Sequence, residues 1–188
     1  MLKHIEEFGK YVAIAGFRNV KIEDLEEFFK KIRKKKGSNV ETQFFDAKYV
    51  ATWQHLYFAV LNALTAFKNN RNISKSLAME TMLYASTQRQ IRKAMEILGI
   101  KSETSEIAVL IIGKNSETVK SALSLISANA IAQPDDTVLE LSEEKNRLIQ
   151  KTFGISNSEL KTVMKKDGLK EALTNLVIER MALTATQR

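Results

Sequence analysis

The chain has 188 residues, of which 44% are hydrophobic and 27% are charged, and it contains no cysteine. This length suits one globular domain with a substantial core. The lack of cysteine excludes disulfides, thiol catalysis and cysteine-based zinc sites. The formal net charge of +7 favours polyanionic partners, nucleic acid first among them.

Two further classes of protein are disfavoured by the residues present. His4 and His55 are the only imidazoles, and they lie in separate segments without nearby carboxylate pairs, so we expect no metal site. No apolar run approaches the length that spans a membrane, and the start of the chain lacks a signal-peptide core. We therefore expect a soluble, cytoplasmic protein without a membrane partner.

The first quarter of the chain predicts a β-α-β unit. Residues 11–17, YVAIAGF, are β-branched and aromatic and predict a buried strand. Residues 22–35 carry apolar side chains at helical spacing, and alternation over residues 40–44 predicts a second strand. Asp46 is then predicted to cap a long, mostly apolar central helix over residues 47–69.

The middle of the chain predicts two short helices before a strong strand. Ser74 is predicted to cap a helix that runs to about Tyr84. Thr87-Gln88-Arg89-Gln90 fits the T-x-x-Q capping box of the next helix, which is predicted to end at Gly99 in a left-handed turn. Residues 106–113, EIAVLIIG, form the clearest strand pattern in the chain.

The last third predicts mainly helices. Its expected elements are a helix from Asn115 or Ser116, an edge strand over 137–141, a helix from Ser142 to Gly154, a helix opened by the Ser156–Glu159 capping box, and a final amphipathic helix after Gly168. The fold class is therefore a single α/β domain over residues 1–188. It should be helix-rich, with a small mixed β-sheet of about four strands packed by about eight helices.

Catalytic motifs are not found in this sequence. The seven glycines form neither a GxGxxG nor a P-loop pattern. Ser86 has no nucleophile-elbow context. The adjacent carboxylate pairs at 26–27 and 143–144 point about 100° apart on a helix, which suits solvated faces better than acid/base catalysis. We expect a non-enzymatic protein with no cofactor.

The densest positive run, Arg33 to Lys36, has two interpretations. It can complement the dipole at a helix C-terminus. Alternatively, Lys34, Lys35 and Lys36 can contact phosphates along a nucleic-acid backbone. The aromatic residues Trp53 and Tyr57 are better explained by core packing than by base stacking, and His55 is expected to be structural.

A second basic segment runs from residue 68 to residue 101, with seven cations against two anions. Within it Tyr84 could stack on a base, Arg89 offers a planar fork for phosphate, and Asn72 and Gln90 offer paired donors and acceptors. Such mixtures read single-stranded RNA ends. The alternative, which spacing leaves equally open, is that these polar residues only cap helices while Tyr84 packs in the core.

At these residues the sequence resembles a known family. The segments NIS, LAMETMLYASTQRQIRKAMEILGIK and EIAVLIIG resemble the PRPK-binding-protein family, the small kinase-binding subunit of the KEOPS (EKC) complex, in its archaeal type. The resemblance implies a non-catalytic subunit without a cofactor. Its implied partners are the atypical kinase/ATPase subunit, through it the threonylcarbamoyl transferase subunit, and tRNA destined for N6-threonylcarbamoyladenosine (t6A) modification.

The resemblance also implies where these partners would bind. The tRNA 3′ CCA end would contact residues of the basic segment, namely Asn72, Ile73, Ser74, Tyr84, Ala85, Ser86, Arg89 and Gln90. The kinase would contact a helical surface that includes the C-terminal helix, for which Val177 and Met181 are our candidates. Apolar positions on more than one face of that helix agree with a partner, although docking on the protein's own sheet would explain them equally well. A pure kinase adaptor without RNA binding is the alternative function.

Overall fold

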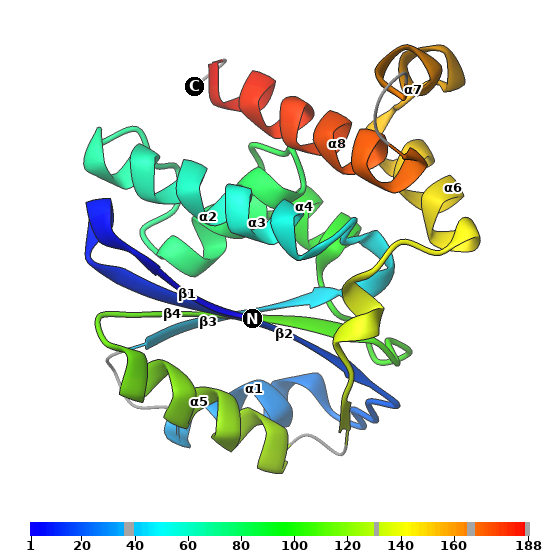
Figure 1. The fold of residues 1–188 in the computed structure, drawn as a ribbon. Coiled ribbons are helices and arrows are strands. Elements are labelled where there is room, and N and C mark those ends of the chain that lie inside the picture. Colours follow the sequence, from blue (N-terminus) through cyan, green and yellow to red (C-terminus); the bar gives the residue numbers. More distant parts are fainter. Residues whose placement is uncertain (36–39, 130–131, 165–167, 187–188) are drawn as a thin grey trace.

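A five-stranded sheet lies between two layers of helices (Figure 1). The computed structural model describes residues 1–35, 40–129, 132–164 and 168–186. The path is β1-β2-β4-β3, with β5 paired to β2, and every pairing of the described strands is antiparallel rather than mixed. The strands are β1 (Leu2–Ile5), β2 (Lys10–Arg18), β3 (Val40–Asp46), β4 (Ile107–Gly113) and β5 (Gln133–Pro134). The expected β-α-β opening is confirmed, whereas β1 and β5 were not expected because they have only four and two residues.

The sequence of β4 does not alternate between apolar and polar residues because both faces of this strand are buried. Ala108, Leu110 and Ile112 enter the core on one face of the sheet, and Ile107, Val109 and Ile111 enter the core on the other. A strand that is covered on both faces reads as a continuous apolar run.

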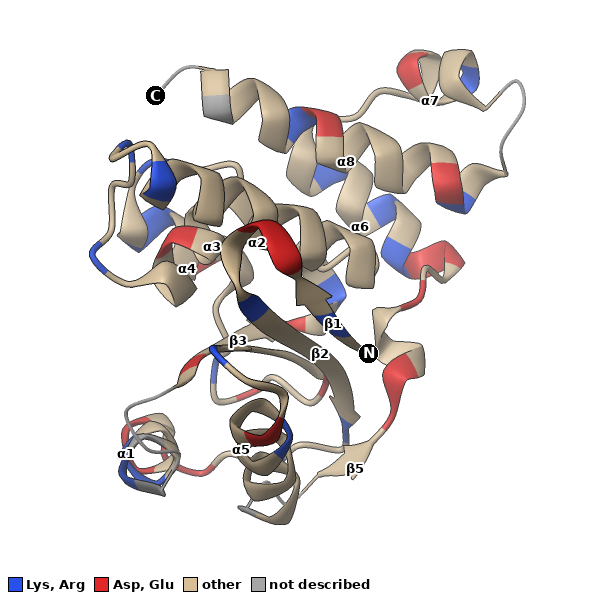
Figure 2. Ribbon diagram, turned by 60° about the vertical axis from the view of Figure 1, so that its left-hand side comes forward, with Lys and Arg blue, Asp and Glu red and all other residues tan. Residues whose placement is uncertain are grey.

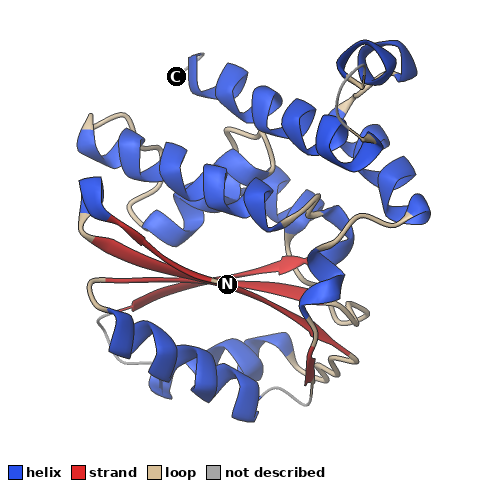
Figure 3. Ribbon diagram, in the orientation of Figure 1, coloured by secondary structure: helices blue, strands red, loops and turns tan. Residues whose placement is uncertain are grey.

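The helices are distributed unequally over the two faces of the sheet (Figures 1 and 3). Helices α1 (Leu25–Lys35) and α5 (Ser116–Asn129) cover one face. Helices α2, α3 and α4 cover the other, and α6, α7 and α8 form a satellite core beside the start of α2. Their bounds are α2 (Trp53–Lys68), α3 (Leu77–Ala85), α4 (Ile91–Leu98), α6 (Glu143–Phe153), α7 (Asn157–Val163) and α8 (Leu169–Thr186). Short 3₁₀ turns are η1 (Glu6–Phe8), η2 (Ala47–Tyr49) and η3 (Asp136–Leu139).

Three boundary predictions are wrong, each for a local reason. Asp46 caps η2 rather than the long helix, accepting from the Lys48 amide at 3.1 Å, and α2 begins only at Trp53. The expected strand at 137–141 is the turn η3, since the Asp135 side chain accepts from the Thr137 amide. Gly99 has a φ of −70° and is not left-handed; a Cβ there would lie 2.4 Å from the Met95 carbonyl oxygen.

Other predictions are confirmed. Helix α6 is opened by the Ser142 side chain and closed by left-handed Gly154. The capping box at Ser156 and Glu159 is present in both directions. Trp53 and Tyr57 are half-buried against the core, where the Lys3 ammonium lies 4.5 and 4.9 Å from their ring centroids.

Candidate functional site

Helix α3 lies at the centre of the candidate site. Eight of its residues are buried, and it packs mainly against α2. The candidate residues therefore come from the two connections that enter and leave this helix. With nine residues, α3 separates these connections by about 13 Å.

The connection before α3 is held by a buried carboxylate. Glu80 is fully buried in the first turn of α3, and its Oε2 accepts the amides of Ile73 at 3.0 Å and Ser74 at 2.7 Å. The Asn72 side-chain amide donates to the Ser74 carbonyl at 3.0 Å. The backbone amides of Ile73 and Ser74 thus both donate to one carboxylate that is buried inside the protein.

The N-cap of α3 is Ser76, so the prediction of Ser74 as the cap is wrong. The Ser76 hydroxyl accepts from the Met79 amide and donates to Glu41 of β3 at 2.7 Å. The same Glu41 oxygen accepts from the Ala78 amide at 2.9 Å. Ser74 is buried, and its hydroxyl accepts from the Ser76 amide. Glu41 and Glu80 together fix the path of the chain into α3.

The connection after α3 is a Schellman motif and not a capping box. Thr87 is left-handed, with a φ of 54°. Its amide donates to the Tyr84 carbonyl at 2.9 Å, and the Gln88 amide donates to the Leu83 carbonyl at 3.0 Å. These two bonds define the helix C-terminal motif. Gln90 is the N-cap of α4 without a side-chain hydrogen bond, so the T-x-x-Q prediction is wrong.

His55 of α2 supports this second connection, which confirms the prediction that it is a structural histidine. Its Nδ1 accepts from the Ala51 amide at 3.2 Å, and its Nε2 donates to the Ala85 carbonyl at 2.8 Å. To accept from Ala51 and donate to Ala85 at the same time, the imidazole must be neutral, with its proton on Nε2. Burial, the largest cause, lowers the pKa of His55 to about 4.

The structure divides the predicted RNA-contacting residues into two sets. Exposed or half-buried are Asn72, Ile73, Arg89 and Gln90; buried are Ser74, Tyr84, Ala85 and Ser86. The Tyr84 ring packs in the main core and is not an exposed stacking face, and the Ser86 hydroxyl donates to the Leu83 carbonyl. The buried set shapes the two connections, whereas a ligand can reach the exposed set.

The second predicted phosphate contact is separated from this site. Lys34 is exposed on α1, on the face of the sheet opposite to α3. Lys35 ends α1, its side chain is outside what the structure describes, and Lys36 lies outside the described residues. Among the described residues, Lys34 therefore belongs to the other helical layer, and whether Lys34, Lys35 and Lys36 contact phosphate stays a prediction.

Figure 2 shows Lys and Arg gathered on α4 and the loops beside it, which we call the basic end of the helical layer. The exposed cations of the two connections and of α4 are Arg71, Lys75, Arg89, Arg92 and Lys93. Of the two anions in the segment, Glu80 is buried and Glu96 pairs with Arg92 at 3.0 Å. The exposed ends of α3 and α4 are thus more basic than the chain as a whole.

The predicted kinase-contact residues are not on the surface. Val177 and Met181 are both 0% exposed and pack in the protein's own core clusters. A groove of about 400 Å³ lies between α8 and the start of α2, and most of its lining residues are polar. Phe58, which is 40% exposed, and half-buried Ile178 lie on opposite walls of this groove.

The described part of the chain lacks a membrane-spanning helix and a metal-binding cluster. None of its helices is long and apolar enough to cross a bilayer. Within the same residues, no three His, Asp or Glu side chains gather into a group that could hold a metal ion.

The fold and its surfaces define a single α/β domain with a basic helical end and a largely polar groove that holds Phe58 and Ile178, features that suit a protein that binds macromolecules. A family model described as "Kinase binding protein CGI-121" matches residues 17–185. The regulatory protein Cgi121 of Methanocaldococcus jannaschii is 38% identical over 113 residues, which cover 60% of this chain and 70% of that protein. The chain belongs to the CGI-121 family of kinase-binding proteins, which confirms the resemblance.

Proposed function

We propose that this protein is a non-catalytic, tRNA-recruiting subunit of a KEOPS-type complex for t6A modification. It binds the kinase/ATPase subunit through one surface and the 3′ CCA end of tRNA through another. Through the kinase it joins the transferase subunit, and it works in the cytoplasm without a cofactor. The family description and the name of the Methanocaldococcus jannaschii relative, a regulatory protein, support the kinase-binding half.

The observation that carries the RNA half is the basic end of the helical layer. There Ile73, 43% exposed, offers an apolar contact for a base, and the exposed Arg89 side chain offers a fork for phosphate. Gln90 is exposed and makes no side-chain cap for α4. Single-stranded RNA ends are recognised by this combination of apolar, amide and cationic groups.

The groove between α2 and α8 is the surface that we assign to the kinase. Its walls come from the first turns of α2 and one face of α8, and it combines Phe58 and Ile178 with polar groups. Interface cores favour aromatic residues such as Phe58, with a polar rim.

Kinase binding is tested by titrating the purified kinase/ATPase subunit with Phe58→Glu and Ile178→Glu variants. Because a charge in an apolar interface stays desolvated, each variant should bind at least about tenfold more weakly. Glu179→Ala is the matched control, since Glu179 is exposed on α8 outside the groove. Equal loss in all three variants, or no loss in the first two, would remove the groove from the proposal.

The alternative function is a kinase adaptor that binds no RNA. The observation that favours it is the burial of half of the predicted RNA contacts, among them Tyr84 and Ser86. An adaptor keeps full kinase affinity and the Phe58 dependence, while its affinity for tRNA is that of any basic protein and falls steeply with salt.

A further inference from the structure

A cavity of about 360 Å³ lies away from α3, beside the N-terminus of α6. Its walls come from η2, from the residues that precede β4, and from α6. They carry two lysines, two glutamates and two serine hydroxyls; the lining residues are Lys48, Ser105, Glu106, Ser142, Glu144, Lys145 and Leu148. Neither proposed binding surface uses this cavity.

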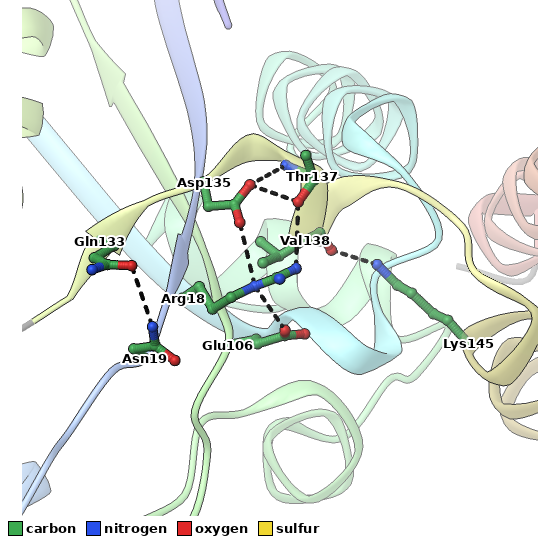
Figure 4. A network of polar contacts seen from close by, with 8 residues as sticks. All are labelled: Arg18, Asn19, Glu106, Gln133, Asp135, Thr137, Val138 and Lys145. Atoms are coloured by element: carbon green, nitrogen blue, oxygen red, sulfur yellow. Dashed lines mark hydrogen bonds and ion pairs between the residues drawn. The ribbon is translucent and has the colours of Figure 1, made fainter.

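Lys145 is the half-buried cation in this wall. Its Nζ donates to the Val138 carbonyl oxygen at 2.6 Å, so it ties α6 to η3 (Figure 4). The turn η3 in turn packs closely on β2, where the Gly16 amide donates to Asp136 at 2.8 Å and a Cβ at Gly16 would lie 2.5 Å from the Asp135 carbonyl.

A network of fixed charges borders the same place. Figure 4 shows the Arg18 guanidinium between Glu106 and Asp135, at 3.2 and 3.3 Å, with the Lys145 side chain reaching η3 from the other side. Glu106 belongs to both the network and the cavity wall. Glu106 is therefore paired with Arg18, and it raises the pKa of Lys145 only through its charge.

We propose that Lys145 is a covalent modification site, which a small acyl phosphate acylates inside this cavity. The neutral amine attacks the acyl carbon, the new C–N bond forms, and the C–O bond to phosphate breaks. The amine proton leaves with the phosphate as hydrogen phosphate, and Lys145 becomes a neutral secondary amide. Lysines in partly desolvated clefts are the ones that react as amines.

The state of the amine supports this chemistry. Burial, the largest cause, lowers the pKa of Lys145 to about 8, against the opposing effect of Glu106 and Asp46. At pH 7.5 about a quarter of such a lysine is neutral, compared with roughly a thousandth of a lysine with an ordinary pKa. The charged or titratable groups that face Lys145 come from α2, α6, η2, β3 and the segment before β4: His55, Glu144, Lys48, Asp46 and Glu106.

Acylation has a structural consequence in the same place. The amide carries no charge and keeps a single N–H, so the contact with Val138 weakens and the first turn of α6 loses its tie to η3. Because α6 packs in the satellite core with α8, the modification changes the part of the molecule that also forms the α2–α8 groove.

The test treats the full chain with acetyl phosphate and follows the acetylation rate of each lysine by mass spectrometry. Lys145 should react at least about tenfold faster than Lys151, an exposed lysine of the same helix. The rate should rise with pH around a midpoint near 8. Similar rates at the two lysines would overturn the proposal.

Two variants test whether Lys145 reacts because of its surroundings or only because it is accessible to the reagent. In Glu106→Gln the midpoint should move to lower pH, because the Glu106 charge raises the pKa of Lys145. An unchanged midpoint would contradict the assignment. In Lys145→Arg, acetyl phosphate should leave hydrogen exchange over residues 138–149 unchanged, whereas in the wild type exchange should rise with Lys145 occupancy. A wild type that shows full occupancy without faster exchange would refute the structural consequence.

Discussion

Single residues decide the shape of the candidate RNA site. Thr87 holds a left-handed backbone, with a φ of 54°, although a β-branched residue rarely does so. Asn70 holds the matching position after α2, also with a φ of 54°, and its amide donates to the Phe67 carbonyl. Both connections around α3 are therefore set by helix C-terminal motifs, one built on a tolerant residue and one on a strained residue.

Replacing the strained residue should stabilise the protein. Thr87→Gly removes the steric cost of the left-handed Cβ and should raise the free energy of unfolding by about 1 kcal/mol. Asn70→Gly is the matched control and should gain less, because asparagine tolerates this conformation. Urea denaturation of both variants measures the difference. A Thr87→Gly variant that is less stable than the wild type would show that the threonine side chain makes a contact that outweighs the strain.

Glu80 is the residue that positions the connection before α3. Glu80→Gln replaces a charged acceptor of the Ile73 and Ser74 amides by a neutral one and should cost about 1–3 kcal/mol of stability. Hydrogen exchange should become faster at these two amides. Glu96→Gln, in an exposed pair on α4, should change the stability by less than about 0.5 kcal/mol. Unchanged exchange at residues 73 and 74 in Glu80→Gln would contradict the positioning role.

His55 gives the stability of the fold a pH dependence with a definite sign. Its folded-state pKa of about 4 lies below the unfolded value near 6.5, so between these values the unfolded chain binds more protons. The contribution of His55 to the free energy of unfolding is fully present above about pH 6.5, and it decreases by about 3 kcal/mol as the pH falls through 4. Denaturation of wild type and His55→Asn at pH 7 and pH 4.5 measures this. If the variant shows the same decrease in stability on acidification as the wild type, the assignment to His55 is wrong.

At the scale of elements, hydrophobic patterns predicted the long elements, whereas local polar motifs were right at α6 and α7 and wrong around α3. The continuous run of β4 and the apolar α2 follow from burial alone, and both were predicted. The pattern T-x-x-Q at 87–90 fits the start of a helix, yet the preceding helix needs Thr87 for its C-terminal motif. Ser74 could have capped α3, but its hydroxyl accepts from the Ser76 amide, and Ser76, held by Glu41 of the distant strand β3, is the cap. Such competition depends on tertiary contacts that short spacing does not encode.

The satellite helices test capping at the element scale. The Ser156 hydroxyl accepts from the Glu159 amide. The Glu159 carboxylate in turn accepts from the Ser156 backbone and side chain and from Arg180 of α8. These hydrogen bonds, that from the Ser156 backbone first, lower the pKa of Glu159 to about 2. Ser156→Ala should cost about 1 kcal/mol in thermal or urea unfolding. Ser158→Ala, at an exposed position within α7, should be neutral or slightly stabilising because alanine favours helices. Equal effects of the two substitutions would mean that the cap does not hold α7.

At the scale of the whole molecule, burial separates the candidate site residues that composition could not separate. Tyr84 and Val177 were singled out for chemistry that an exposed side chain would perform, and both lie in the core. The sequence does not predict this burial, because an aromatic or apolar residue in the protein's own core and one in a partner interface give the same sequence pattern. The exposure of Arg89, by contrast, was predictable, since charged side chains are rarely buried.

The two proposed surfaces lie on different parts of the helical layer. The basic end surrounds the connections of α3, and the groove lies between α2 and α8. The proposed function uses both surfaces. The kinase adaptor alternative uses only the groove, so the RNA half of the proposal is the one that distinguishes the two accounts.

The most direct measurement is the affinity of the full chain for intact tRNA and for the same tRNA lacking its CCA end, at one fixed salt concentration. The proposed function predicts at least about a tenfold loss when CCA is removed, and the same loss for intact tRNA with Arg89→Ala. Lys151→Ala, an exposed cation on α6 away from the site, should bind like the wild type. Equal affinity for both tRNAs would contradict recognition of the CCA end and leave the kinase adaptor as the function.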